Sequence, residues 1–346
     1  MIQQAMSHQQ QIDVSVIIPT FNRLWCLPRA IESCRGTRCA TEVIIVDDGS
    51  TDGTWEWITG QSGIIALRQP NQGQTWAINR GFSAARGRYI RFLDSDDYLV
   101  PGIIDRQFEA AQSCDADVVC SRVDDYYQDS GLIKENPEVR DWDDFMAIQL
   151  GGYGSHFLGM MFRRELVEMV PRRPDFANRE DRIFLLEIAL LKPRIVCVPG
   201  CAGYWVHHDS QMQGNYRGMK AVVTNWQSLG IYRRILSELE RQGDLTPRRK
   251  KAACKVLWPL AHWIGYSHLE EASEVADWVF NLDPEFRAPE KGLLGLLYRN
   301  VGFRKTELLL RIRRNFLAPF RAVARRNSCS LLLNNARSRA VEGQTE

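Results

Sequence analysis

Three aspartates lie close together in the sequence, directly after a short and mainly apolar run. Tyr89 to Leu93 is aromatic and aliphatic except for Arg91, and Asp94-Ser95-Asp96-Asp97 follows it. Acidic side chains crowded at the end of a buried strand are costly unless a cation or hydrogen-bond donors neutralise them. Hard cations such as Mg²⁺ or Mn²⁺ prefer carboxylate oxygens and share their shell with substrate phosphates. The segment therefore predicts a divalent metal site that bridges a diphosphate to the protein. A solvated acidic loop is the alternative.

A second acidic turn follows another apolar run. Val43 to Val46 leads into a turn that begins with Asp47-Asp48-Gly49. A carboxylate at the carboxyl end of a strand, followed by a glycine turn, is placed to accept hydrogen bonds from a bound base or ribose. The alternative is an ordinary turn in which Thr51 or Asp52 caps the next helix.

The first third of the chain alternates between patterns typical of strands and of helices. Repeated strand–helix–strand units predict an α/β fold with a mainly parallel sheet and helices on both faces. Ligands bind at the carboxyl ends of the strands in such sheets, so we expect both acidic turns at one edge. The expected strands are 14–18, 43–46, 64–67, 89–93 and 117–121, and the expected helices are 26–34, 51–58, 74–85 and 102–111.

The pattern changes from Gly151 onward. Residues 151–156 form a glycine-rich loop, and Arg179-Glu180-Asp181 opens a strongly apolar helix. Two acids in the first turn of a helix match its dipole, so capping alone is one interpretation of this pair. We expect the loop to order when a ligand binds. After about Arg217 the chain is rich in tryptophan and helical in pattern.

The composition is that of a soluble globular protein, with 45% hydrophobic and 25% charged residues in 346. No stretch reaches the roughly 18 consecutive apolar residues of a membrane-spanning helix. Met1 to Asp13 is polar and lacks the apolar core of a signal peptide. The nine cysteines include no C-x-x-C pair, so we expect reduced thiols in a cytoplasmic protein rather than a zinc site.

A basic segment lies near the C-terminus. Residues 299–326 contain nine basic residues and one acid, Glu307, although the whole chain has a net charge of only +2. A basic amphipathic helix of this type can lie on an anionic membrane surface. A helix packed on the protein with solvated arginines is the alternative, and nothing upstream supports nucleic-acid binding. Apolar residues recur here every three or four positions: Leu308, Ile312, Phe316, Phe320 and Val323.

Five segments carry a resemblance to a known family: 14–23 (VSVIIPTFNR), 46–52 (VDDGSTD), 71–73 (NQG), 77–81 (AINRG) and 87–97 (GRYIRFLDSDD). In this order and spacing they resemble family 2 glycosyltransferases of the GT-A fold. The resemblance covers about residues 12–210. It implies a nucleotide-sugar donor, a divalent metal and an inverting transfer of one sugar to an acceptor hydroxyl.

The resemblance also implies roles for individual residues. Asp181, in the E-D pair, is implied as the general base. Asp94 and Asp96 match the D-x-D element, with Asp96 as the more direct metal ligand. His207 rather than His208 fits the spacing of the H-x-x-S element near the diphosphate and metal, although a core histidine is the alternative. The residues implied or expected to line the nucleotide, with Asp47 on a uracil base, are Pro19, Thr20, Asn22, Arg23, Asp47, Asp48, Asn79, Asp94 and Ser95. The residues expected on the acceptor side are Tyr153, His156, Glu180 and Trp205.

One segment departs from the family pattern. Many members have Ala-Arg-Asn where this chain has Ala77-Ile78-Asn79, so Arg80 or Arg91 is expected to compensate, or else the donor pocket differs. Two other enzyme classes fit less well. A D-x-D phosphatase carries its motif on the first strand rather than the fourth, and no G-x-G-x-x-G of a dinucleotide oxidoreductase follows strand one. A degenerate transferase that only binds sugar nucleotide is the non-enzymatic alternative.

We therefore expect a polar leader at 1–12, a catalytic domain at 13–215 and a helical region at 216–346. The nucleotide-sugar half of the catalytic domain is expected at about 13–122, and the acceptor half at about 123–215. The expected reaction is transfer of a hexosyl or N-acetylhexosaminyl group from a UDP-sugar to a saccharide or lipid-linked saccharide. Bacterial surface polysaccharide assembly at the cytoplasmic face of the inner membrane would fit this reaction.

Overall fold

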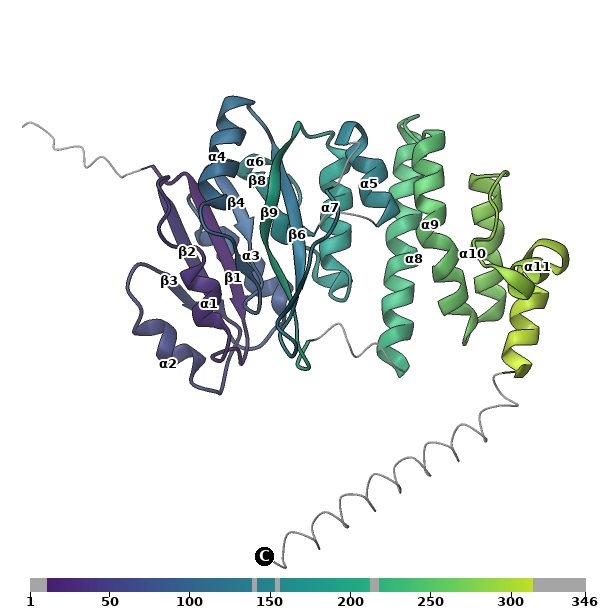
Figure 1. Ribbon diagram of the computed structural model, residues 1–346, viewed down its shortest axis with the longest axis horizontal. Helices are drawn as coiled ribbons and strands as arrows, with labels where there is room; N and C mark the ends of the chain where they lie inside the picture. Colours follow the sequence, from purple (N-terminus) through teal and green to yellow (C-terminus); the bar gives the residue numbers. More distant parts are fainter. Residues whose placement is uncertain (1–10, 139–141, 153–155, 212–217, 314–346) are drawn as a thin grey trace, which may run out of the picture. The chain divides into compact units, whose positions relative to one another are not determined.

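The computed structural model describes residues 11–138, 142–152, 156–211 and 218–313 (Figure 1). The chain forms two compact units that divide between Val256 and Leu257. The change from strands to helices comes before this division. The last strand is β9 (Ile195–His207), and the helix α8 (Gly218–Arg241) follows it. The predicted boundary at 215/216 therefore lies at the change from strands to helices, whereas the units separate inside the helical region. The predicted polar leader lies almost entirely outside the described residues.

Four parallel strands form one half of a nine-stranded sheet, in the order β3-β2-β1-β4. All seven residues of β1 are buried, as expected for a strand covered on both faces. β1 and β2 pair from Val14↔Thr41 to Thr20↔Asp47, so the segments that follow them start at the same edge. The bounds are β1 (Val14–Thr20), β2 (Thr41–Asp47), β3 (Ile65–Arg68) and β4 (Tyr89–Phe92).

The second half of the sheet is mixed. β8 pairs antiparallel with both β4 and β6, and β6 pairs parallel with β9. β5 and β7 add antiparallel to β9 and β6. The predicted α/β fold is confirmed, with antiparallel strands in the half where the sequence pattern changes. The bounds are β5 (Tyr98–Leu99), β6 (Val118–Tyr127), β7 (Leu132–Lys134) and β8 (Met160–Arg163).

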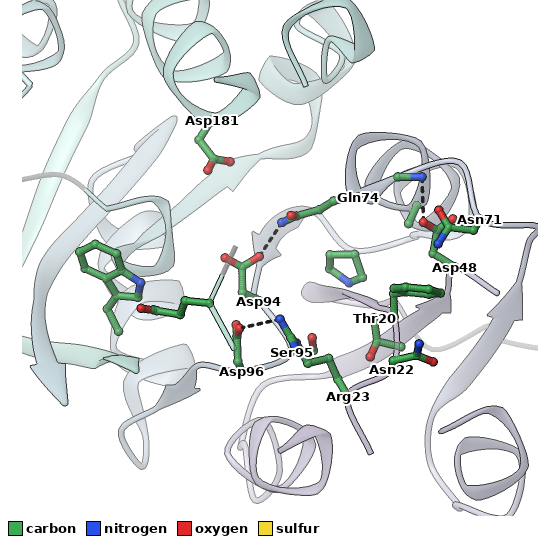
Figure 2. A pocket seen from close by; sticks show the side chains of 16 residues that line it. Thr20, Asn22, Arg23, Asp48, Asn71, Gln74, Asp94, Ser95, Asp96 and Asp181 are labelled. Atoms are coloured by element: carbon green, nitrogen blue, oxygen red, sulfur yellow. Dashed lines mark hydrogen bonds and ion pairs between the residues drawn. The ribbon is translucent and has the colours of Figure 1, made fainter. Parts of the chain in front are cut away.

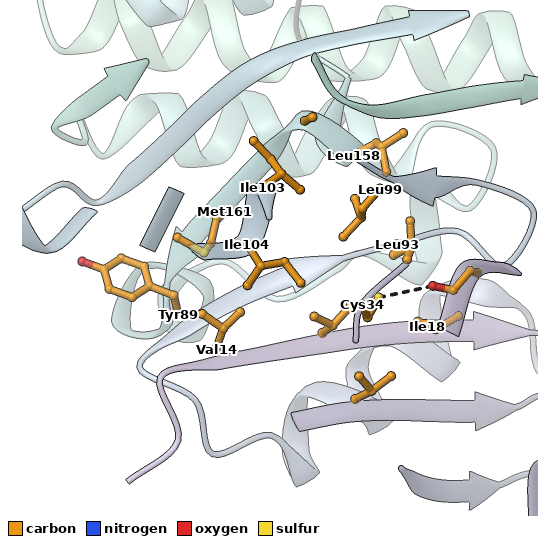
Figure 3. Packing of buried hydrophobic residues seen from close by; sticks show 14 of the residues in the cluster. Val14, Ile18, Cys34, Tyr89, Leu93, Leu99, Ile103, Ile104, Leu158 and Met161 are labelled. Atoms are coloured by element: carbon orange, nitrogen blue, oxygen red, sulfur yellow. Dashed lines mark hydrogen bonds between the residues drawn. The ribbon is translucent and has the colours of Figure 1, made fainter. Parts of the chain in front are cut away.

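Helices cover both faces of the sheet, as predicted. Val14, Val16 and Ile18 alternate along β1 toward one core, which also contains side chains of α1 and α4 (Figure 3). Ile17 points to the other face, where α3 approaches so closely that a Cβ on Gly81 would lie 2.5 Å from Ile17 Cγ2. The four predicted helices of this part are all found: α1 (Leu27–Glu32), α2 (Thr54–Thr59), α3 (Gln74–Ala84) and α4 (Ile103–Ser113).

The acidic pair lies where a buried helix begins. α7 (Glu180–Leu190) starts on Glu180, and five of its apolar side chains beyond the first turn are fully or almost fully buried. Three short 3₁₀ turns precede it at Trp142–Asp144, Phe157–Gly159 and Pro174–Phe176. The other helices here are α5 (Phe145–Gly151) and α6 (Arg164–Met169).

The second unit packs around Trp258. This buried ring lies 5.2–5.9 Å, centroid to centroid, from four other aromatic rings: Phe280, Phe286, Tyr298 and Phe303. α9 (Pro247–Gly265) contains the division between the units, and α10 (Leu269–Leu282), α11 (Gly292–Val301) and a helix at 303–313 follow. The expected helical C-terminal region is confirmed. Among the described residues, no helix combines the length and apolarity needed to cross a membrane.

Candidate active site

A pocket of about 540 Å³ opens at the carboxyl ends of β1 and β4 (Figure 2). This is the edge at which an α/β sheet binds its ligands. Ten of the predicted site residues line the pocket: Pro19, Thr20, Asn22, Arg23, Asp48, Asp94, Ser95, Asp96, Asp181 and Trp205. The other lining residues are Phe21, Asn71, Gly73, Gln74, Ala77 and Gln211.

Asn22 ties the loop after β1 to the loop after β2. Its φ of 53° lies in the left-handed region, which asparagine tolerates better than most residues. The Asn22 N–H donates to Ser50 Oγ, and Asn22 Oδ1 accepts from the Thr51 N–H, both at 2.8 Å. The two loops expected to contact a nucleotide are therefore fixed to each other by the protein itself.

Asp48 holds the loop that precedes α3. Its Oδ1 accepts from the Gln72 N–H at 2.9 Å and its Oδ2 from the Gly73 N–H at 2.8 Å. Gly49 allows this close approach, because its φ is +82° and a Cβ there would lie 2.9 Å from Asn71 N. Asp48 thus shapes one wall of the pocket by binding backbone groups.

The prediction that Asp47 contacts the base does not match its position. The carboxylate of Asp47 is fully buried and does not line the pocket. Its Oδ1 accepts from the Ser50 N–H at 3.2 Å, and its Oδ2 lies 3.2 Å from Arg68 Nε. Adjacent residues at the end of a strand point to opposite faces, and here Asp48 is the one that faces the pocket.

Asp94, Asp96 and Asp97 converge at the end of β4. One carboxylate oxygen of each lies within 4.8 Å of the others. Burial, and then the charges of its two acidic neighbours, raise the pKa of Asp94 well above its usual range. Burial and the charge of Asp96 likewise raise the pKa of Asp97. Gln74 Nε2 donates to Asp94 Oδ1 at 2.7 Å, and the Val206 N–H donates to Asp97 Oδ1 at 2.9 Å.

These three residues fit a divalent cation. Mutual repulsion and burial disfavour three ionised carboxylates unless positive charge is added. Asp97 Oδ2 is buried and has no hydrogen-bond partner among the described residues, so an unpaired acceptor stands beside Asp94 and Asp96. An all-carboxylate donor set suits Mg²⁺ or Mn²⁺. Within the described ranges no other group of three such ligands was found.

His208 and Arg23 surround Asp96. His208 Nε2 lies 3.1 Å from Asp96 Oδ2, while His208 Nδ1 accepts from the Ser210 N–H at 3.2 Å. Because Nδ1 is an acceptor, the neutral ring carries its proton on Nε2 and donates it to Asp96. Arg23 Nη2 lies 3.7 Å from the same carboxylate oxygen and donates to Ser210 O at 3.3 Å.

The structure places His208, and not the predicted His207, beside Asp96. His207 Nε2 lies 2.7 Å from Asp125 Oδ1, and its ring stacks on Tyr127 with 4.6 Å between centroids. His207 is the last residue of β9 and pairs with β6 in the sheet. His208 follows the end of the strand, where the chain is free to turn toward Asp96. The H-x-x-S spacing selects His207, but it does not say which of two adjacent side chains faces the acid cluster.

Asp181 lies on the opposite side of the pocket from the acid cluster, on α7 (Figure 2). Its side chain is 37% exposed, whereas that of Glu180 is 6% exposed and does not line the pocket. Arg172 Nη1 lies 2.7 Å from Glu180 Oε2 and 2.9 Å from Asp181 Oδ1. Burial raises the pKa of Glu180 well above its usual range. Burial also acts to raise the pKa of Asp181, but the hydrogen bond with Glu180 and the charge of Arg172 outweigh it and lower that pKa. The lowered pKa keeps Asp181 ionised at neutral pH.

Asn79, predicted to bind nucleotide, does not reach the pocket either. Its Nδ2 donates to Arg172 O at 3.0 Å, and its Oδ1 accepts from the Arg172 N–H at 3.2 Å. Neither predicted replacement for the missing motif arginine lines the pocket. Arg80 is exposed, and Arg91 is buried in the core, where it donates to Leu158 O. Neither arginine therefore takes the place of the missing motif arginine in the pocket lining.

Trp205 is the predicted acceptor-side residue that lines the pocket. His156 stacks on it, with 5.2 Å between ring centroids, but does not line the pocket itself. Burial lowers the pKa of His156, so its ring is neutral at pH 7. Tyr153 lies outside the described residues.

Sequence reasoning missed several residues of the site. Asp97 is the third acid of its segment, but the D-x-D spacing points only to Asp94 and Asp96. Gln74 and Gln211 belong to no recognisable motif. Arg172 stands in a loop beside another arginine, and no local pattern marks it as a partner of the acidic pair.

The fold and the pocket define a class of protein: an α/β domain whose sheet edge carries a carboxylate cluster suited to a metal and phosphates, with a separate ionised carboxylate facing it. Residues 15–170 match the model of glycosyl transferase family 2. This part of the chain belongs to that family, so the predicted family is confirmed.

Two curated relatives and one solved structure illustrate the match. The uncharacterized glycosyltransferase alr2836 of Nostoc sp. is 34% identical over 169 residues, which are 45% of this chain and 52% of the relative. The succinoglycan biosynthesis protein ExoO of Rhizobium meliloti is 31% identical over 212 residues, which are 56% of this chain and 60% of ExoO. The chain thus spans little more than half the length of these relatives. The crystal structure of S. aureus TarS 1-349 in complex with UDP-GlcNAc superposes with a TM-score of 0.53 at 17% identity, over 87% of this chain and 92% of that chain. This likeness agrees with the expected GT-A fold.

Proposed function

We propose that this chain transfers a sugar from a UDP-sugar to a hydroxyl of a saccharide or lipid-linked saccharide, with inversion at the anomeric carbon. The pocket carries the proposal, because Asp94 and Asp96 line one side of it and Asp181 lines the other (Figure 2). The relatives that match the family domain include one whose name assigns it to succinoglycan biosynthesis, which supports a saccharide acceptor.

The loops after β1 and β2 would hold the nucleotide. Thr20 Oγ1 is buried without a hydrogen-bond partner among the described residues, so it is available to a ligand in the pocket. Asn71 and Ser95 add neutral donors and acceptors to the lining. Arg23 supplies a cation close to Asp96, where the diphosphate of the donor would lie.

Asp94, Asp96 and Asp97 would hold a divalent cation, Mn²⁺ or Mg²⁺. When bound, such an ion stabilises the negative charge that develops on the departing diphosphate. The hydrogen bond from His208 orients the Asp96 carboxylate, as groups behind a metal ligand commonly do. Gln74 does the same for Asp94.

Asp181 would act as the general base. It is ionised and partly exposed to the pocket, so it can accept the proton of an acceptor hydroxyl as that oxygen attacks the anomeric carbon. Attack from the side opposite the leaving diphosphate inverts the anomeric centre. A second carboxylate that protonates the leaving group, as in glycosidases, is not needed because a diphosphate leaves without a proton. Trp205 would pack against a sugar ring.

A donor panel tests this proposal. Purified protein is incubated with UDP-, GDP- and dTDP-sugars, with Mn²⁺ or with EDTA, and thermal stabilisation and nucleoside diphosphate release are measured. UDP-GlcNAc is a sensible first donor, since TarS was crystallised with it. We expect metal-dependent stabilisation by one donor, which Asp96→Ala loses. Asp181→Asn should keep the stabilisation and lose the release. Wild-type protein that binds a donor but shows no release, with saccharide acceptors supplied, would favour the degenerate binding protein instead.

We also propose that the second unit contacts an anionic membrane surface, which would bring the enzyme to a lipid-linked acceptor. Leu308, Leu309 and Ile312 are exposed on the helix at 303–313, beside the exposed cations Lys305 and Arg311. This combination suits the interface of an anionic bilayer. The rest of the predicted basic segment, 314–326, lies outside the described residues.

Flotation with lipid vesicles tests the membrane proposal. We expect the chain to float with vesicles that contain phosphatidylglycerol and not with pure phosphatidylcholine. Leu308→Ser combined with Ile312→Ser should reduce flotation and leave donor binding unchanged. Equal flotation with both vesicle types, or none with either, would refute the proposal.

A further inference from the structure

Arg172 occupies an aromatic box behind the pocket. Its guanidinium carbon lies 4.0 Å from the ring centroid of Phe184, 4.4 Å from that of Phe92 and 5.5 Å from that of Phe157. The residue is only 2% exposed and does not line the pocket. A fully buried cation is costly unless anions compensate its charge. The anionic partners of Arg172 therefore indicate which groups it acts on.

Those partners are the two acids at the start of α7. A single nitrogen, Nη1, contacts both Glu180 Oε2 and Asp181 Oδ1. The other two guanidinium nitrogens, Nε and Nη2, are buried and have no hydrogen-bond partner among the described residues. Among the described residues, the guanidinium therefore has side-chain hydrogen bonds only with this pair. Since one guanidinium faces two carboxylates, one negative charge is matched and the second is not.

The exposure of the two acids decides which one keeps the negative charge. Glu180 is buried, whereas Asp181 is partly exposed to the pocket. A buried carboxylate takes up a proton more readily than an exposed one. The other charged or titratable groups that act on Asp181 are Asp94 across the pocket and His156.

The backbone of Arg172 is fixed independently of its side chain. Asn79, on α3, exchanges two hydrogen bonds with the N–H and C=O of Arg172. α3 also packs on β1. Through Asn79 and α3, the backbone of Arg172 is thus linked to the sheet. The same sheet carries Asp94, on the opposite side of the pocket.

We propose that Arg172 is the positioning residue of Asp181: its buried guanidinium holds this carboxylate in place and aims it into the pocket, while Glu180 lies behind it and does not line the pocket. The inference rests on the proposed function, because it assigns Asp181 the role of base. It adds a cation that touches neither donor nor metal and acts only through the carboxylate.

The test compares two adjacent arginines in steady-state kinetics. Arg172→Met should lower kcat roughly 100-fold, as expected when a reacting group is misplaced, with donor binding within threefold of wild type. The acidic limb of its kcat–pH profile should move to higher pH. Arg173→Met is the matched control, because Arg173 pairs with Asp175 and Glu187 and does not line the pocket. It should leave kcat and the profile unchanged.

Two conservative variants keep the test decisive if Arg172→Met does not fold. Arg172→Lys keeps the charge and should recover part of kcat with a wild-type acidic limb. Glu180→Gln should keep more activity than Asp181→Asn, because Glu180 does not line the pocket. The assignment would be overturned if Glu180→Gln were inactive and Asp181→Asn active. It would also be overturned if the acidic limb of the kcat–pH profile stayed at the wild-type pH in Arg172→Met as well as in Arg172→Lys. These outcomes presuppose measurable wild-type turnover, so absence of turnover in the wild type would instead count against the proposed function.

Discussion

His208 donates its ring proton to Asp96 across 3.1 Å, although the two residues are 112 positions apart in the chain. The neighbouring His207 instead forms a hydrogen bond with Asp125. One of two adjacent histidines thus belongs to the acid cluster, and the other belongs to the sheet.

Replacing each histidine by alanine should separate these roles. Loss of a group that orients a metal ligand typically costs roughly 10–100-fold in metal affinity or activity. We expect His208→Ala to raise the Mn²⁺ concentration needed for half-maximal donor stabilisation by a factor in that range. His207→Ala should leave the metal requirement close to wild type. The measurement is a Mn²⁺ titration at saturating donor, and the reverse order of effects would restore His207 as the metal-side residue.

Asp97→Asn should stabilise the metal-free protein while weakening its response to metal. The substitution removes one of three converging carboxylates and keeps a similar shape, so repulsion and burial of charge both decrease. A gain of about 1 kcal/mol would raise Tm by roughly 2–4 °C. Differential scanning calorimetry with EDTA and with Mn²⁺ measures both effects. A variant less stable than wild type in EDTA would show that the cluster is not under electrostatic strain.

The cluster of Asp94, Asp96 and Asp97 should make the stability of the metal-free protein decrease with rising pH. The folded pKa values of Asp94 and Asp97 are raised, so the folded state holds protons that the unfolded state has lost above about pH 4. The free energy of unfolding should therefore fall as pH rises from about 4 toward those folded pKa values. We expect Mn²⁺ to reduce this slope. Melting curves between about pH 4.5 and 8, with EDTA or Mn²⁺, check it, and parallel slopes would contradict it.

Gly49→Ala should damage the donor side of the pocket. A Cβ at this position would meet Asn71 N at 2.9 Å, and the φ of +82° is strained for alanine. We expect a loss of about 1–3 kcal/mol in stability together with weaker donor binding. Gly53→Ala is a useful control, because its φ is also positive but its Cβ would approach only Leu24, at 3.7 Å. Equal donor affinity in the two variants would mean that the Asn71 loop does not bind the donor.

A histidine in the second unit should make that unit pH-sensitive. His262 lies between Glu307 Oε1, 2.6 Å from its Nδ1, and Glu290 Oε1, 3.1 Å from its Nε2. Burial acts to lower the pKa of His262, but the two glutamates outweigh it and raise that pKa. Its contribution to stability is therefore complete below about pH 6.5 and lost as pH rises through the folded pKa. The Tm difference between wild type and His262→Gln should shrink from about pH 6 to 9. A constant difference would show that His262 is neutral throughout.

The strands and helices of the first third could be predicted because their sequence signals are local. Val14 to Ile18 is apolar except for Ser15, and such runs are typical of strands buried on both faces. β5, with two residues, is too short to give a pattern, and it exists only because Tyr98 pairs with Tyr204 of β9. Long-range pairing of this kind is set by the assembled sheet and leaves no mark in a sequence window.

In the candidate site, too, some residues could be predicted from local sequence signals and others could not. Asp94, Asp96 and Asp181 follow from motifs, because each stands at a defined end of a strand or helix. The partners of these carboxylates do not follow from motifs. Arg172 meets Asp181 only after a loop has folded back on α7, and the choice between Asp47 and Asp48 depends on which of two adjacent side chains faces the pocket.

Asp48 uses both of its carboxylate oxygens on backbone N–H groups of the loop at 72–73. The course of this loop is therefore set by groups that every amino acid except proline possesses. The side chain of Asn71, which lines the pocket beside it, is free to vary without unfolding the loop. If the proposed function holds, substitutions at position 71 should change which nucleotide sugar binds, while Asp48 and Gly49 keep the wall of the pocket in place.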